Sequence, residues 1–192
     1  FTTINEGVFT FEAVKRYENY ARDILRVFTS VYGNLTRLFN DTLTNVEVRF
    51  FIPDFDTFLS VGGYVPFTGG EIGEININIF FERAVNGTTE LIGVHELVHH
   101  FVWEARLSPN DFLWFHEGMA QFVSIETVDA MGYEDAAQEE RERLEQGAAR
   151  LGGNFGFVQQ WSPDPEPQNI GAYYAASYYV VNELAKMYGG FD

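Results

Sequence analysis

The sequence contains no cysteine, and this absence limits the kinds of site that the chain can build. None of its 192 residues is a cysteine. Disulfide bonds and zinc sites with thiolate ligands are therefore excluded. Any metal ion bound by this protein must be held by histidine, glutamate or aspartate side chains.

Positively charged residues and long apolar runs are also scarce. Twelve Lys and Arg residues stand against 28 Asp and Glu residues, which gives a formal net charge of −16. Long-range repulsion from this charge disfavours nucleic acid and anionic membrane surfaces as partners. No segment reaches the run of about 18 apolar residues that a membrane-spanning helix requires. We therefore expect neither a nucleic-acid partner nor a membrane-spanning segment in this chain.

Apolar and aromatic residues, by contrast, are plentiful. They make up 46% and 17% of the chain, with 19 phenylalanines, which is enough to form a large core. The length suits one domain. The chain opens on Phe1 rather than Met, from which we expect a processed form or an excised domain. The sequence leaves its cellular compartment and oligomeric state open.

The first part of the chain shows both helical and strand periodicity. Apolar residues at helical spacing predict a helix over residues 10–39. Residues 45–52 are rich in β-branched and aromatic side chains and predict a strand, and residues 58–66 predict another. In residues 74–81, isoleucines alternate with polar residues, which predicts a strand with one buried face.

The rest of the chain is predicted to be mostly helical. One helix should follow a Thr88 or Thr89 cap and run to about Arg106, and the next should begin at Ser108-Pro109 and end near Gly132. Two more are predicted over residues 134–151 and 170–188. This order of a helix, then strands, then further helices predicts an α+β fold. We expect one domain over residues 1–192, with an upper α/β part (1–106) and a lower helical part (107–192).

A metal-binding pattern lies within the first of these helices. His95-Glu96-Leu97-Val98-His99 reads H-E-x-x-H. Residues four apart share one face of a helix, so His95 and His99 can bind one metal ion. Glu96 lies further round the helix, where it can reach a water molecule at an open metal position. All four histidines of the chain fall within residues 95–116.

A catalytic metal site of this kind needs a third protein ligand. A third histidine six residues after His99 is excluded, because Ala105 occupies that position. The alternative is a carboxylate on the next helix, and Glu117 offers one.

Two segments together carry a family resemblance. HELVH (95–99) followed by WFHEGMAQF (114–122) resembles the gluzincin zinc metallopeptidases, and the second segment is similar to the W-L-x-E-G-x-A signature of the aminopeptidase N-like branch and its smaller relatives. The resemblance covers residues 75–188 as a pattern. It implies a zincin-like core, in which a small mixed sheet has an edge strand above the active-site helix and a mostly helical lower part follows. It also implies zinc held by His95, His99 and Glu117, and hydrolysis of peptide bonds by a metal-activated water with Glu96 as general base and acid.

The resemblance also implies roles for residues outside the ligand set. The last predicted helix offers four candidates for the hydroxyl that stabilises the oxyanion, and we expect Tyr174 to supply it; the others are Tyr173, Tyr178 and Tyr179. His116 stands where the larger enzymes usually have Asn, and we expect it to face solvent or to support the ligands rather than to contact substrate. The strand around Ile75 resembles the edge strand that binds an extended substrate. The G-x-M-E-N motif of aminopeptidases is absent, which favours an endopeptidase acting on peptide or protein substrates.

Two other interpretations stay open. The chain could be a binding or structural domain that keeps a gluzincin-like core and a metal ion without turnover. The intact Glu96 weighs against this, because a silent domain does not need that carboxylate. The motif could also have arisen by chance, in which case the protein binds no metal.

Overall fold

A five-stranded mixed sheet forms the N-terminal half of the fold. The computed structural model describes residues 1–54, 61–83, 86–162 and 167–190. The strand order is β1-β2-β3-β7-β4; β2, β3 and β7 run parallel, and each outer strand is antiparallel to its neighbour. The strands are β1 (Thr2–Glu6), β2 (Phe9–Ala13), β3 (Val46–Phe51), β7 (Ile75–Asn78) and β4 (Gly63–Tyr64). A separate hairpin pairs β5 (Phe67–Thr68) with β6 (Glu71–Ile72).

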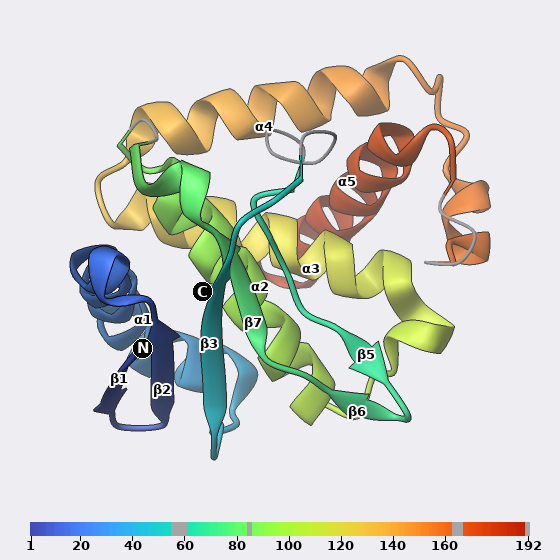
Figure 1. Ribbon diagram of the computed structural model, residues 1–192. Helices are drawn as coiled ribbons and strands as arrows, with labels where there is room; N and C mark the ends of the chain where they lie inside the picture. The colour runs from blue at the N-terminus through green and yellow to red at the C-terminus, as the bar shows by residue number, and fades with distance from the viewer. Residues whose placement is uncertain (55–60, 84–85, 163–166, 191–192) are drawn as a thin grey trace.

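Five α-helices complete the described fold, and the predicted α+β class is confirmed. Figure 1 shows α1 beside the first strands and α3, α4 and α5 gathered on the other side, with α2 between these two groups. Helix α2 contacts α1, the strands β4 and β7, and α3. The helices are α1 (Glu18–Phe39), α2 (Thr88–Glu104), α3 (Pro109–Ala130), α4 (Glu134–Ala149) and α5 (Ile170–Tyr188), with short 3-10 segments at Lys15–Tyr17, Ile79–Arg83 and Gly156–Gln160.

The core between α1 and the sheet is built on aromatic rings. Phe28 of α1 meets Phe9 and Phe11 of β2 edge-on, with ring centroids 5.3 and 5.6 Å apart. Gly93 of α2 lies against the same ring, and a β-carbon there would stand 3.0 Å from Phe28. The absence of a side chain at Gly93 therefore lets α2 approach α1 closely. This contact holds the central helix against the N-terminal half of the fold.

The N-terminal helix begins at Glu18, so the prediction of a helix from residue 10 is wrong over its first turns. Phe9, Phe11 and Ala13 are buried, whereas Glu12 between them is exposed. This alternation is the period of a strand, and residues 9–13 pair with β1 on one side and β3 on the other. Strand pairing with residues far along the chain outweighs the helical spacing that continues from α1.

The strand around Ile75 is not an edge strand and is not half-buried, which corrects two further predictions. β7 lies between β3 and β4, and all four of its residues are buried. Asn78 donates to the Val61 carbonyl at 2.8 Å and accepts from the Phe80 amide at 2.9 Å. Among the described residues, the outermost strand on this side is β4.

The other predicted helix boundaries lie close to the observed ones, but the residue that caps α2 differs from the prediction. Ser108 accepts a hydrogen bond from the Asn110 amide and caps α3, as predicted. Helix α2, however, is capped by Gly87, and Thr89 instead donates to the Phe81 carbonyl. Of the predicted strand 58–66, residues 58–60 lie outside the described residues and only Gly63–Tyr64 is a strand. Within the described part of the chain, every helix is too short or too polar to traverse a lipid bilayer.

Gly118→Ala is expected to lower the free energy of unfolding by about 1–3 kcal/mol, because it overpacks the contact between α3 and α5. A β-carbon at Gly118 would lie 2.6 Å from the Ser177 carbonyl oxygen and 2.7 Å from Val181. The backbone carbonyl cannot move without shifting α5. Urea unfolding measures the change. The control is Gly33→Ala in α1, where nothing lies within 4 Å, and which should stabilise the helix. Equal stability of the two variants would contradict the packing argument.

Candidate metal centre

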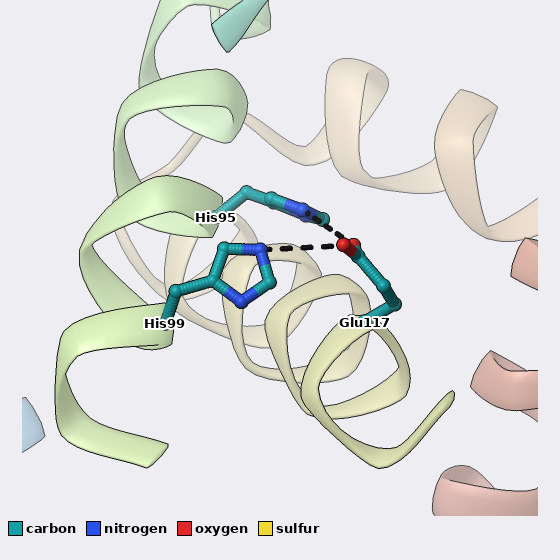
Figure 2. A group of neighbouring side chains, drawn as sticks. All are labelled: His95, His99 and Glu117. Carbon is teal, nitrogen blue, oxygen red and sulfur yellow. Dashed lines mark hydrogen bonds and ion pairs between the residues drawn. The ribbon is translucent and has the colours of Figure 1, made fainter. Parts of the chain in front are cut away.

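Three side chains from two helices meet at the contact between α2 and α3. His95 and His99 project from the same face of α2, and Glu117 reaches them from α3 (Figure 2). One ligand atom from each residue lies within 4.8 Å of the others. The structure therefore brings the three residues predicted from the sequence into one group that could hold a metal ion.

The spacing of the ligand atoms suits a tetrahedral ion. Oε2 of Glu117 lies 3.1 Å from Nε2 of His95 and 3.6 Å from Nε2 of His99. Zinc bonds to nitrogen and oxygen of about 2.0–2.2 Å place two tetrahedral ligands roughly 3.3–3.5 Å apart. The two observed separations bracket this value. These two separations are therefore compatible with a tetrahedral metal ion bound between the glutamate and the imidazoles.

Burial and mutual contact set the charges of His95, His99 and Glu117. Burial lowers the pKa of His99 to about 3, so this imidazole is neutral near pH 7 and has a lone pair to offer. Burial alone would raise the pKa of Glu117, but His99 and His95 outweigh it and lower that pKa. Burial alone would lower the pKa of His95, but its hydrogen bond to Glu117 and the nearby carboxylates raise it. Glu117 is therefore an ionised acceptor facing both rings.

Glu96 lies beside this group and outside it. Its side chain is on α2 next to His95, and the residue is only 5% exposed. Strand β4 passes over it: a β-carbon on Gly63 would stand 2.8 Å from Cγ and 3.0 Å from Oε1 of Glu96. Burial raises the pKa of Glu96 to about 7, with a smaller opposing effect of His95. A carboxyl group with this pKa can both accept and release a proton near neutral pH.

Tyr174 is on α5, outside the group of three ligands. Its ring is half-buried and meets Trp161 edge-on, with centroids 4.9 Å apart. It lies within electrostatic reach of Arg143, which binds Glu140 through two hydrogen bonds of 2.6 and 2.8 Å. Glu140 in turn is one of the carboxylates that raise the pKa of His95 against the effect of burial. The role of Tyr174 at the oxyanion stays a prediction.

Helix α4 therefore approaches the candidate site, and it contacts both α2 and α3. This approach was not predicted from the sequence. The charged pattern of residues 134–151 resembles an exposed helix, and no motif marks Glu140 or Arg143. The one available signal is their spacing of three residues, which predicts an ion pair but not its neighbours. Of the two roles expected for His116, the solvent-facing one is wrong, because the residue is fully buried.

Comparisons with models of known protein families and with curated proteins find no match for this chain. The structure itself shows an α+β fold with a mixed five-stranded sheet and a buried His-His-Glu group that could hold a metal ion.

Proposed function

We propose that this chain is a zinc-dependent peptidase of the gluzincin type, most simply an endopeptidase, with Glu96 as its general base. The observation that carries the proposal is the convergence of two imidazoles on one oxygen of Glu117, next to a buried carboxyl group that is not itself in the ligand group. The H-E-x-x-H and W-x-x-E-G-x-A patterns support the same conclusion.

The donor set favours zinc over other common ions. Two imidazoles and one carboxylate are a ligand set that catalytic zinc sites use, and they leave a fourth position for water or substrate. Magnesium and calcium prefer sites made of oxygen ligands, which this group does not offer. Zinc bound here would supply Lewis acidity, which lowers the pKa of water and polarises a carbonyl oxygen.

Side chains of the protein would carry out the proton transfers and stabilise the oxyanion. Glu96 takes a proton from the attacking water and then donates it to the leaving amine, for which a pKa near 7 is suitable. A hydroxyl such as that of Tyr174 donates a hydrogen bond to the oxyanion. These steps need no covalent intermediate with the protein.

The strand above Glu96 supports a peptide as the substrate. β4 is the outermost described strand on its side of the sheet and pairs antiparallel with β7. The unpaired backbone groups of an outer strand can bind an extended peptide by adding it to the sheet. Because Gly63 of β4 lies directly against Glu96, such a peptide would run past the proposed base. β4 therefore takes the substrate-binding role that the sequence analysis gave to the strand around Ile75.

Elemental analysis and a peptide-library assay test the proposal. We expect about one zinc ion per chain, cleavage of internal peptide bonds, loss of cleavage after treatment with a chelator, and its return when zinc is added. Bound zinc without cleavage of any library peptide would favour the metal-binding structural domain. A chain that takes up no zinc would overturn the proposal.

A further inference from the structure

His116, the residue before Glu117, is a fully buried imidazole on α3. Its Nε2 lies 2.6 Å from the Leu107 carbonyl oxygen. A carbonyl oxygen only accepts, so Nε2 carries the proton and donates. Leu107 belongs to the short connection between the end of α2 at Glu104 and the start of α3 at Pro109. This hydrogen bond therefore ties the helix that carries Glu117 to the segment that leaves the histidine helix.

The bond spans a break in α3. Phe112 has φ −136° and ψ 42°, which are not helical, so the first turn of α3 is offset from the rest of the helix. Leu107 lies before this break and His116 lies after it. Regular helix geometry thus does not determine where Glu117 stands relative to the connection. The hydrogen bond from His116 supplies this link instead.

The same ring also contacts a proposed metal ligand. The imidazoles of His116 and His99 stack, with centroids 5.7 Å apart and planes at 23°. Phe67 of β5 meets both rings edge-on, at 6.1 Å from His99 and 5.6 Å from His116. His99 is therefore held by two aromatic neighbours, one of which also anchors α3.

We propose that His116 is a positioning residue: through its bond to Leu107 and its stacking on His99, it holds His99 and Glu117 at the separation that a metal ion requires. This inference rests on the proposed zinc site. Residues that orient metal ligands typically change metal affinity by about 10–100-fold when they are replaced. A residue that only fills space would change the stability of the metal-free protein without such a selective effect on zinc.

Two substitutions separate the two contacts of His116. His116→Phe keeps a ring that can stack on His99 but cannot donate to the Leu107 carbonyl. His116→Gln keeps an N–H at a similar reach but has no ring. For each we measure the zinc dissociation constant by competition with a chelator, the visible spectrum of the cobalt-substituted protein, and thermal unfolding without metal. His100→Phe is the control, because His100 is also buried on α2 and, like His116, makes one hydrogen bond to a backbone group, here that of Gly73.

We expect His116→Phe to bind zinc about 10–100-fold more weakly than wild type and to alter the cobalt spectrum. His116→Gln should recover part of the affinity, and His100→Phe should keep wild-type affinity even where it unfolds at lower temperature. Wild-type affinity and spectrum in His116→Phe would overturn the positioning role alone. An equal loss in all three variants would assign His116 to general packing. A wild-type chain that binds no zinc would overturn both this inference and the proposed function.

Discussion

Glu96→Gln is expected to abolish peptide hydrolysis while the protein keeps its zinc. Glutamine has nearly the shape of glutamate but cannot accept a proton from water. Removal of a general base typically lowers the rate by about 10²–10⁴-fold, and kcat should fall by at least this factor. Zinc content should not change, because Glu96 lies outside the three-residue ligand group. Cleavage of a library-derived peptide and elemental analysis on the same sample measure both effects.

The environment of Glu96 allows this substitution to change catalysis with little effect on stability. The residue is 5% exposed under β4, and burial raises its pKa to about 7, so the neutral amide replaces a group that is readily protonated in its surroundings. We therefore expect little change in the free energy of unfolding. Glu104→Gln is the matched control, since it alters an exposed carboxylate at the end of the same helix and should leave activity intact. Cleavage by Glu96→Gln at the parent rate would show that another group is the base.

Glu117→Gln is expected to remove tight zinc binding and, with it, the stabilisation that zinc gives to the folded protein. A ligand that binds only the folded state adds about 4 kcal/mol of stability at a thousand times its dissociation constant. Wild-type protein should therefore unfold at a clearly higher temperature when zinc is in excess. The variant loses the ionised oxygen that faces both imidazoles at 3.1 and 3.6 Å, so its unfolding temperature should hardly respond to zinc.

The control for this prediction is Glu126→Gln, nine residues further along α3. Glu126 pairs with Arg141 at 3.1 Å and is partly exposed, so its loss should change stability by less than about 1 kcal/mol and leave the zinc response intact. Calorimetry with and without zinc measures the difference for each variant. A zinc-dependent rise in Glu117→Gln as large as that in the parent would exclude Glu117 as a ligand.

Helical periodicity predicted much of the fold, because it depends on residues only three or four apart in the sequence. The predicted helices over residues 88–106, 134–151 and 170–188 match α2, α4 and α5 to within two residues at each end. The Ser108 cap of α3 is also confirmed, since it depends on residues adjacent in the chain. Strand predictions were less complete. β1 was missed, β2 was assigned to a helix, and β4 is only two residues long in the described part, because short strands are stabilised by pairing partners elsewhere in the sequence.

In the candidate site, sequence spacing alone places His95 and His99 on one helix face, since four residues are close to one helical turn. The W-x-x-E-G-x-A motif also indicated Glu117 as the candidate third ligand, but it did not indicate where Glu117 lies relative to the two histidines. Three other features follow from the packing of the folded chain: Glu117 meets both rings, β4 covers Glu96, and His116 is buried against His99. These contacts join elements that are far apart along the chain or separated by a break in α3. Their distances depend on how whole helices and strands pack, which no local repeat in the sequence encodes.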